Sequence, residues 1–475
     1  MTDIVVVGGG GAGLSAAAEA ARLGRKVTLV EKNARVGGTT GIAVGTLMAA
    51  CTDMQRRAGI EDSPRRHEEE FAKLSAALGL VDNPALLRLL TENVPDTVNF
   101  LASIGVDFVG PLFQPPFPTQ RFYQALPGGR AYVRRLLIEC RRLGVEIRTG
   151  VKAQQLRYEA GRVTGVETKG EIFRSRAVIL ASGDFSANHQ MRAELLGPGA
   201  DRIDAINPDS TGDGQRMAMA IGAKLARRPD LPAARLVQAR FPPPARMDFI
   251  AGLPPWRVLT LAMKYAMTWL PNSVLRPIIL RAAMTALAPE RALYEEGAIL
   301  VNRQGERFAD ELGLPAPEIA RQPEGEAFLL FDARIAEKYN HWPHYVSTAP
   351  GVAFAYVADY QRVRPDICFT APSVEELATR LKMPPAALAA TVAKTKLAAP
   401  FHAMGPLKAW LLLTHTGLAV DTRLQVLSES GAPIPGLYAA GGAGQGGFNS
   451  IYHGHSLGWA FTSGRLAGRF AAFDT

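Results

Sequence analysis

The 475-residue chain is poor in cysteine, with three in total. Cys51, Cys140 and Cys368 stand far apart, and none of them belongs to a CxxC pair. Disulfide frameworks and zinc sites need closely and regularly spaced cysteines, so the sequence predicts neither a disulfide scaffold nor a bound metal. Scattered reduced thiols are typical of a reducing compartment. We therefore expect a cytoplasmic protein.

Long uncharged apolar runs are also missing. The first predicted strand, residues 3–7, follows the initial methionine almost directly, which leaves no room for a signal peptide. The most apolar stretch, residues 256–287, is interrupted by basic residues such as Arg257 and Lys264, and these charges exclude a spanning helix. The stretch instead predicts two amphipathic helices around Pro271. They either form the core of a domain, which we favour, or dip into a membrane surface.

Acidic residues are fewer than basic ones, 44 against 53, and the formal net charge is +9. The basic residues are scattered, often as pairs such as Arg134-Arg135, and no recognition module accompanies them. Nucleic-acid-binding proteins gather their positive charge on one module. We therefore expect no nucleic-acid partner and interpret the excess as a solvated arginine-rich surface. Contact with an anionic membrane is kept as an alternative.

The N-terminus carries the most informative pattern. It is the order strand, glycine turn, helix, strand, acid, which is typical of the βαβ unit that binds a dinucleotide. The pattern consists of a β-branched run at residues 3–7, glycines at residues 8–13, a helix-prone stretch at residues 14–23, a second strand at residues 27–30, and Glu31.

The glycines of this unit and Glu31 each have a physical role. Gly8 permits the tight turn, Gly10 lets the backbone approach the pyrophosphate, and Gly13 lets the helix pack closely on the strand. The helix N-terminus attracts phosphate through free N–H groups and a partial positive charge. Glu31 stands where a carboxylate accepts hydrogen bonds from ribose hydroxyls.

A second glycine pair, Gly37-Gly38, follows with Thr39 and Thr40. A second phosphate-contacting loop suits a large, permanently held cofactor, so the sequence predicts FAD rather than an exchanging nicotinamide. Only one dinucleotide fingerprint is present in the sequence. We therefore expect electrons to pass to an external acceptor.

The length exceeds the usual size of one hydrophobic core, which favours two domains. Prolines accumulate between residues 229 and 255 and mark an irregular boundary. The other predicted elements are strands at residues 146–149, 176–180 and 298–301, a hairpin at 155–168, a helix at 215–221, a strand entering a glycine loop at 436–442, and a closing helix at 456–472.

Several of these motifs, in this order, resemble one known family. They are the N-terminal fingerprint, Ala181-Ser182-Gly183, Thr211-Gly212-Asp213-Gly214, Ile299-Leu300-Val301-Asn302 with Gly305-Glu306-Arg307-Phe308, Pro435-Gly436-Leu437-Tyr438-Ala439-Ala440-Gly441, and Ser456-Leu457 through Gly464-Arg465. The chain is similar to the FAD-dependent fumarate reductase/succinate dehydrogenase flavoprotein superfamily, which includes the 3-ketosteroid dehydrogenases.

This resemblance implies an α/β fold with a Rossmann-like FAD-binding domain of the GR2 type, split between both chain ends, and an inserted α+β cap domain. We expect the FAD-binding domain at residues 1–228 and 401–475, the cap at residues 229–400, and the active site between them. The first histidine of the chain is His67, which makes a histidyl-flavin bond improbable, so the FAD is expected to be noncovalent.

The motifs and the resemblance together predict the cofactor-binding residues. Val151 is expected at the adenine, and the segment around His455 at the flavin pyrimidine, where a helix N-terminus stabilises negative charge. The full set is Gly8, Gly10, Gly11, Ala12, Gly13, Glu31, Lys32, Gly37, Gly38, Thr39, Thr40, Gly45, Thr46, Val151, Ala181, Ser182, Gly183, Thr211, Gly212, Asp213, Gly441, Gly442, His455, Ser456 and Leu457.

Two arginines that the resemblance to fumarate reductases would require are missing. Leu314-Pro315 stands where the acid arginine is expected, and residues 448–455 lack the arginine that clamps a carboxylate. A dicarboxylate needs guanidinium partners to offset its desolvation, so fumarate and succinate are unlikely substrates.

Neutral amphipathic side chains stand near these positions: Tyr452, His453 and His415, with Tyr123 in a segment where ketosteroid dehydrogenases place a tyrosine. Such donors suit a carbonyl oxygen, and histidine or tyrosine can accept the acidified α-proton. The sequence thus predicts an FAD-dependent oxidoreductase acting on a C–C bond next to the carbonyl of a hydrophobic, steroid-like ketone. The alternatives are an unsaturated carboxylate other than fumarate and a membrane-associated electron-transfer flavoprotein.

Overall fold

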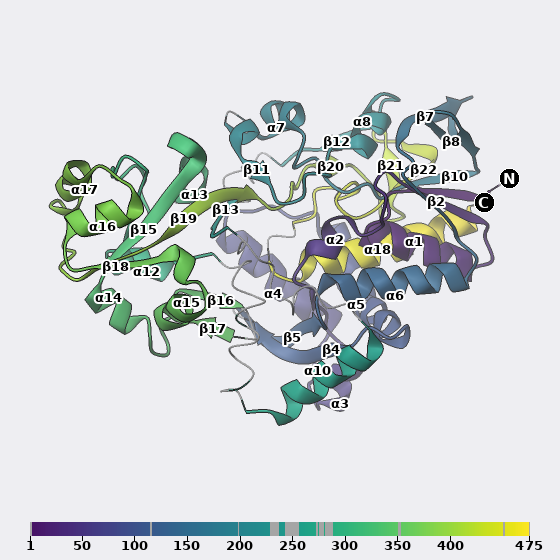
Figure 1. Cartoon of the computed structure of the whole chain (residues 1–475). Helices are drawn as coiled ribbons and strands as arrows, with labels where there is room; N and C mark the ends of the chain where they lie inside the picture. Colours follow the sequence, from purple (N-terminus) through teal and green to yellow (C-terminus); the bar gives the residue numbers. More distant parts are fainter. Residues whose placement is uncertain are drawn as a thin grey trace.

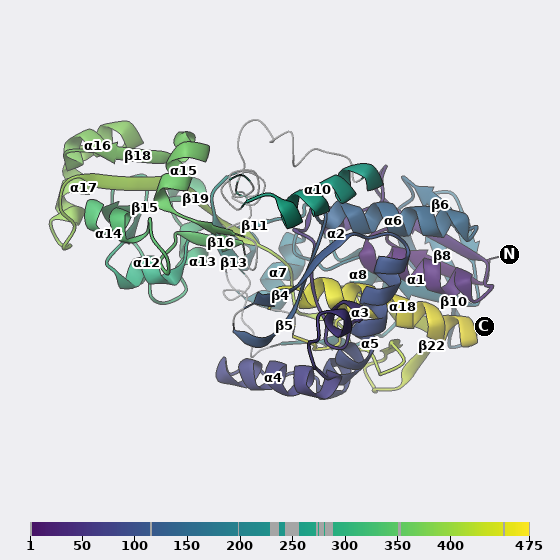
Figure 2. The same ribbon diagram turned by 90° about the horizontal axis from the view of Figure 1, so that it is seen from below.

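The chain forms two lobes that lie side by side in the computed structural model (Figures 1 and 2). The structure describes residues 2–114, 116–197, 199–228, 237–242, 256–271, 274, 280, 288–349, 353–449 and 452–474. Both chain ends belong to one lobe, here called the main lobe, and they lie together at its outer edge (Figure 1). The middle of the chain forms the other, the cap lobe.

A six-stranded sheet organises the main lobe. Its order is β21-β22-β10-β1-β2-β6, and all neighbouring strands are parallel except the β21–β22 pair. Every residue of β1 and β10 is buried. Parallel sheets are covered on both faces, which is why these strands read as continuous apolar runs.

Helices α1 (Gly11–Arg22) and α18 (His455–Phe473) pack against each other although they stand at opposite ends of the sequence. The pairing joins the N-terminal and C-terminal segments into one core, which also contains the strands of the main sheet. The split organisation expected from the sequence is therefore present.

The remaining described elements of the main lobe are β1 (Ile4–Val7), β2 (Val27–Glu31), α2 (Gly38–Ile42), β3 (Thr46–Met48), α3 (Asp53–Arg57), α4 (Pro64–Ala77), α5 (Pro84–Ser103), β4 (Phe108–Gln114), β5 (Phe117–Ala125), α6 (Gly129–Arg142), β6 (Glu146–Thr149), β7 (Ala153–Glu159), β8 (Arg162–Thr168), β9 (Ile172–Arg174), β10 (Ala177–Leu180), α7 (His189–Leu196), α8 (Asp213–Met219), β12 (Leu225–Ala226), β20 (Gly417–Leu418), β21 (Gln425–Leu427) and β22 (Pro433–Ala439).

The cap lobe is built on β19, an eleven-residue strand that pairs with β15, β18, β13 and β11. Its described elements are β11 (Asp204–Ala205), β13 (Val237–Arg240), α12 (Arg291–Glu295), β14 (Ile299–Val301), α13 (Pro315–Ile319), β15 (Glu326–Asp332), α14 (Ala333–Lys338), β16 (Ser347–Ala349), β17 (Ala353–Ala355), α15 (Val357–Val363), β18 (Cys368–Ala371), α16 (Val374–Leu381), α17 (Pro385–Val392) and β19 (Phe401–Leu411). Helix α10 (Arg257–Trp269) stands between β13 and α12 in the sequence.

The predicted return to the main lobe at residue 401 is wrong. Residues 401–411 are β19, whose antiparallel partners β15 and β18 lie in the cap sheet. The chain re-enters the main lobe after Leu411, where β20 pairs with β12. Strand partners far apart in sequence are decided by tertiary packing, and local composition does not report them.

The expectation that residues 256–287 form cap core is also wrong for the part that the structure describes. Helix α10 lies against the main lobe and exposes Val258, Tyr265 and Trp269. Most of residues 272–287, the second predicted helix, lie outside the described residues. Within the described part of the chain, no helix combines the length and apolarity needed to cross a bilayer.

Candidate functional site

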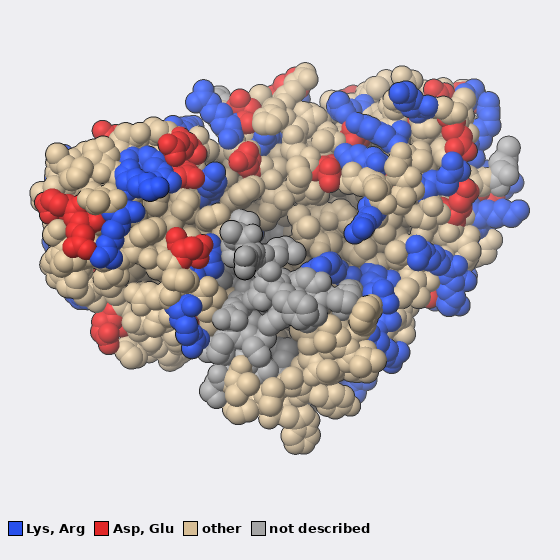
Figure 3. All heavy atoms as spheres, viewed as in Figure 1, with Lys and Arg blue, Asp and Glu red and all other residues tan. Residues whose placement is uncertain are grey.

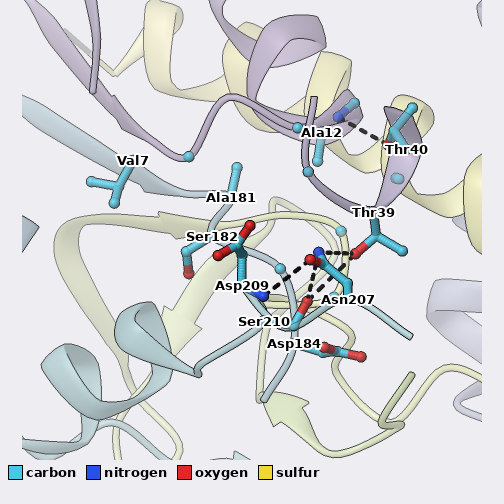
Figure 4. Close-up of a pocket in the computed structure, with 18 of the residues that line it drawn as sticks. Val7, Ala12, Thr39, Thr40, Ala181, Ser182, Asp184, Asn207, Asp209 and Ser210 are labelled. Atoms are coloured by element: carbon cyan, nitrogen blue, oxygen red, sulfur yellow. Dashed lines mark hydrogen bonds between the residues drawn. The ribbon is translucent and has the colours of Figure 1, made fainter. Parts of the chain in front are cut away.

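A long pocket opens at the carboxyl ends of β1, β2 and β10, where a parallel sheet offers a crevice for ligands. It encloses about 1180 Å³ of space between atoms, including solvent at its mouth. The lining combines both chain ends. It includes residues 7, 8, 10–12, 30–33 and 38–40 from the N-terminal part, and residues 181–184, 441, 442, 445, 456, 457, 459 and 460 from later in the chain. Figure 4 shows part of this wall, with Val7 and Ala181 on adjacent strands.

The glycine turn forms one side of the pocket. A Cβ atom on Gly13 would lie 1.9 Å from the carbonyl oxygen of Gly8, so only glycine allows α1 to start this close to β1. Gly10, Gly11 and Ala12 at the start of α1 line the pocket. The positive end of the helix dipole therefore meets any ligand bound there.

Glu31 lies at the end of β2 with both carboxylate oxygens held by backbone. The amide of Gly9 donates to Oε2 over 2.7 Å, and the amide of Asn33 donates to Oε1 over 2.8 Å. These bonds fix the carboxylate at the pocket wall. Each oxygen keeps a further lone pair, which can accept a ribose hydroxyl.

Lys32 binds across the pocket to the loop before α8. Its Nζ donates to Thr211 Oγ1 over 2.6 Å and to Asp213 Oδ2 over 2.9 Å. Burial alone would raise the pKa of Asp213, but the hydrogen bonds from Lys32 and Thr211 hold that pKa well below its usual range. The carboxylate is therefore charged, and the ion pair connects β2 with α8.

Two polar side chains that the sequence analysis missed, those of Asn207 and Ser210, form a cluster with the predicted Thr39 in the pocket wall. Asn207 Nδ2 donates to Thr39 Oγ1 over 2.8 Å and to Ser210 Oγ over 3.1 Å (Figure 4). Thr40 Oγ1 accepts from the amide of Gly11 over 3.1 Å. Asn207 and Ser210 directly precede the predicted Thr211-Gly212-Asp213 motif, and this proximity was the available signal.

Asp184 is another pocket residue for which the sequence analysis predicted no role. Its buried carboxylate lines the pocket and accepts from the amide of Thr414 over 2.7 Å. Burial raises the pKa of Asp184, despite the further hydrogen bonds from the amide and hydroxyl of Ser186. Asp184 thus fastens the segment that returns from the cap lobe to the end of β10.

The C-terminal end of the pocket is formed by the start of α18. Ser456, Leu457, Trp459 and Ala460 line it, so this helix N-terminus faces the pocket. His455 does not lie in the described lining. It is fully buried, and its Nε2 lies 3.1 Å from Nε2 of His67 on α4.

Burial is the main reason why both imidazoles of this pair stay neutral. It lowers the pKa of His67 to about 3, with a smaller contribution from the charge of Arg121. It also lowers the pKa of His455 well below its ordinary value. Phe71 packs against His455 with ring centroids 4.5 Å apart, so the pair belongs to a packed aromatic cluster.

Two of the four predicted catalytic side chains face the interior and not the pocket. Tyr123 is fully buried on β5, and its hydroxyl lies 2.6 Å from Thr52 Oγ1. Burial raises the pKa of the Tyr123 phenol further above neutral pH. The hydroxyl therefore stays protonated and cannot take up a substrate proton. Tyr452 is half-buried against Phe71 and Phe117. Tyr123 does not belong to the described pocket lining, and its hydroxyl in β5 contacts Thr52.

The two predicted catalytic histidines lie next to pocket segments. His415 is buried and follows Leu413 and Thr414, which line the pocket. His453 is solvent-exposed and stands shortly before Ser456. Desolvation by the protein atoms around its ring lowers the pKa of His453, and the charge of Arg240 on β13 lowers it further.

Arg240 on β13 is a charged residue that acts on His453 and that the sequence analysis did not identify. Its guanidinium donates to Gln238 Oε1 over 2.8 and 3.1 Å. Burial lowers its pKa to about 10, which leaves it charged at neutral pH. No carboxylate among the described residues pairs with it. A charged guanidinium without a carboxylate partner among the described residues can bind an anionic substrate.

The predicted cofactor residues divide into two groups. Those that line the pocket are Gly8, Gly10, Gly11, Ala12, Glu31, Lys32, Gly38, Thr39, Thr40, Val151, Ala181, Ser182, Gly183, Asp213, Gly441, Gly442, Ser456 and Leu457. Those outside its described lining are Gly13, Gly37, Gly45, Thr46, Thr211, Gly212 and His455.

Members of the second group support the wall from behind. The amide of Gly37 donates to Gly9 O over 2.9 Å, and Gly45 O accepts from the hydroxyl of Tyr132 over 2.9 Å. Thr46 belongs to β3, which pairs with β5. The amide of Gly212 donates to Asp184 O over 3.1 Å.

The pocket fits an FAD molecule by its chemistry. The N-terminal residues of two helices, α1 and α18, line it, so two positive dipole ends face the pocket. The lining also includes the fixed carboxylate of Glu31 and the hydroxyls of Thr39 and Ser210. Dipoles suit the pyrophosphate and the electron-rich pyrimidine, and the carboxylate suits the ribose.

Comparison with known proteins agrees with this pocket. Residues 3–242 and 257–458 match the family model described as an FAD binding domain. Fumarate reductase (cytochrome) of Shewanella frigidimarina is 27% identical over 503 residues, which cover 99% of this chain and 77% of that protein. 4-Oxocyclohexanecarboxylate 2-dehydrogenase of Sinomonas cyclohexanicum is 27% identical over 595 residues, 99% and 92% of the two chains.

A solved structure is also similar over the whole chain. It is 3-ketosteroid-Δ4-(5α)-dehydrogenase of Rhodococcus jostii RHA1 in complex with 4-androstene-3,17-dione, with a TM-score of 0.63, 26% identity, and coverage of 99% and 96%. The family match spans both lobes. The chain therefore belongs to the FAD-binding family of fumarate reductase/succinate dehydrogenase-like flavoproteins and is an FAD-dependent oxidoreductase acting on CH–CH groups.

Proposed function

We propose that this enzyme forms or reduces a C–C double bond next to the carbonyl of a hydrophobic ketone, such as a steroid-like ring. The observation that carries the proposal is the position of two histidines next to residues that line the pocket. His415 directly follows Leu413 and Thr414, and His453 stands three residues before Ser456. Both carry an imidazole, which can donate or accept a hydrogen bond, and the segments that carry them, residues 413–415 and 452–457, contain no arginine.

The chain's own residues would handle the proton. A carbonyl acidifies its α-proton, and a neutral imidazole accepts that proton. The lowered pKa of His453 keeps its imidazole neutral at physiological pH. His415 is placed to donate a hydrogen bond to the carbonyl oxygen or to take the proton. Bound FAD supplies hydride acceptance or donation at the β-carbon.

Two relatives carry names that agree with this chemistry: a dehydrogenase of a ketosteroid and one of 4-oxocyclohexanecarboxylate. One dinucleotide fingerprint is present in the sequence, so an external acceptor or donor would exchange electrons with the flavin. We also propose that the FAD is noncovalent. Acid precipitation should release the flavin into the supernatant, and flavin retained in the pellet would contradict this.

Anaerobic mixing tests the proposed substrate class. Oxidised enzyme is mixed with saturated cyclic ketones, and reduced enzyme with cyclic enones, while the flavin spectrum is followed. Substrates should bleach or restore the flavin, and His415→Asn and His453→Gln should each slow this change by about 100-fold. His341→Asn, which alters an exposed histidine of the cap surface, is the control. Equal rates in all variants would contradict the assignment.

A second candidate is supported by Arg240. Its charged guanidinium lacks a carboxylate partner among the described residues and influences His453. A single substrate carboxylate could bind there, which favours an unsaturated monocarboxylate. If this is correct, Arg240→Gln should weaken carboxylate binding about 10-fold to 100-fold and leave ketone binding unchanged. Ketone-specific flavin reduction in both proteins would exclude the second candidate.

A further inference from the structure

Helix α10 exposes an apolar face to solvent, which is the reverse of an ordinary surface helix. Val258, Ala262, Tyr265 and Trp269 recur at spacings of four, three and four residues and therefore share one side. All four are exposed, with 83% of Val258, 64% of Tyr265 and 80% of Trp269 accessible. Trp256, just before the helix, is 59% exposed.

The opposite side of α10 is attached to the main lobe. Thr260 is buried, and its hydroxyl donates to Asp107 Oδ2 over 2.5 Å. This contact fixes the rotation of the helix and keeps the apolar stripe outward. In Figures 1 and 2 the helix lies on the outside of the molecule, beside α6 and β4.

Basic residues outnumber acidic ones around the stripe. Helix α10 contains Arg257 and Lys264 and no acidic residue. Burial lowers the pKa of Arg135 on α6, Asp107 raises it, and the nearby charges of Arg257 and Arg134 lower it. Figure 3 shows a mostly tan surface over α10, with lysine and arginine side chains beside it over α6.

We propose that α10 docks the enzyme on an anionic phospholipid bilayer. An interfacial helix inserts aromatic and aliphatic side chains between headgroups while basic residues beside them contact lipid phosphates, and α10 has this arrangement. The stripe is exposed, and the helix that carries it contains basic residues and no acidic one, which complements an anionic surface. The proposal concerns attachment and does not depend on the substrate proposed above.

Vesicle co-sedimentation of the holoenzyme tests this proposal. Phosphatidylcholine vesicles are compared with vesicles that also contain phosphatidylglycerol, at low and at physiological salt. The enzyme should sediment with the anionic vesicles, and salt should weaken its binding. The triple variant V258S/Y265S/W269S should bind about 10-fold more weakly or worse. Ile172→Ser, which changes an exposed apolar residue on β9, is the matched control.

A second measurement separates the apolar and the charge contributions. Anionic vesicles should shift the tryptophan emission of the wild type to shorter wavelength, and Trp269→Phe should reduce this shift. R257Q/K264Q should weaken binding to anionic vesicles and leave binding to phosphatidylcholine unchanged. Flavin content checks that each variant is folded.

Three outcomes would overturn the proposal. The first is a wild-type enzyme that stays in the supernatant with anionic vesicles. The second is a triple variant that binds as tightly as the wild type. The third is a concentration-dependent dimer that the triple variant abolishes while vesicle binding is unchanged, which would assign the stripe to a second copy of the chain.

Discussion

Individual buried polar residues decide how the two lobes meet. Asp184 connects the end of β10 with Thr414, the residue before His415, so it positions a candidate catalytic histidine without contacting substrate. Nothing in the sequence pattern indicated this role, because the partner lies 230 residues away. Arg240 was missed for the same reason: its proximity to His453 arises only when β13 pairs with β19.

The raised pKa of Asp184 gives a pH-dependent prediction. A carboxyl group whose folded pKa is raised stabilises the fold below its unfolded pKa, and this stability is lost as pH rises through the folded pKa. Asp184→Asn removes the ionisation. Between about pH 4 and about pH 7 the melting temperature of the variant should therefore rise relative to that of the wild type. A difference independent of pH would contradict the assignment.

The His67–His455 pair predicts the opposite trend. The lowered folded pKa values mean that stability is complete above the unfolded pKa of 6.5 and falls as pH drops toward about 3. His67→Gln should make this fall shallower by up to about 1.4 kcal/mol per pH unit. Urea unfolding from about pH 7 to about pH 5 measures it. Identical slopes in both proteins would show that the pair does not titrate as described.

Elements with strong local signals were predictable from the sequence. Strands β1, β2, β6 and β10 lie within a residue or so of their predicted ranges. Helix α1 begins at Gly11, three residues before the predicted Leu14, because glycines of the turn already form its first turn. The apolar period of α10 was recognised, but periodicity does not state which face is covered, so its outward stripe required the structure.

The contact between α1 and α18 can be tested through a pair of glycines on one helix. A Cβ on Gly464 would lie 2.3 Å from Ala12 O, whereas a Cβ on Gly458 would meet its nearest neighbour at 3.7 Å. Gly464→Ala should separate the helices and destabilise the protein by about 1–3 kcal/mol, with loss of FAD affinity. Gly458→Ala is the matched control and should be neutral or stabilising by up to about 1 kcal/mol.

Chemical unfolding and flavin fluorescence measure these two effects. Equal stability of the Gly464→Ala and Gly458→Ala variants would mean that the close approach of α1 and α18 does not hold the FAD-binding lobe together.

At the scale of the whole molecule, the sequence predicted the cofactor better than the reaction. The glycine fingerprint and Glu31 act locally, so the FAD pocket follows from the N-terminal segment and its C-terminal complement. The proposed reacting site contains His415 and His453 of the main lobe, and the second candidate function adds Arg240 of the cap lobe. Such a site depends on how β19 leads from the cap sheet back to the main lobe, which local patterns do not encode.

The most direct test of the account is anaerobic mixing of the reduced holoenzyme with a cyclic enone, followed by flavin absorbance and by analysis of the product. We predict reoxidation of the flavin, formation of one saturated ketone per flavin, and no comparable reaction with fumarate. A flavin that stays reduced with every enone and unsaturated monocarboxylate, yet is reoxidised by fumarate, would contradict the account.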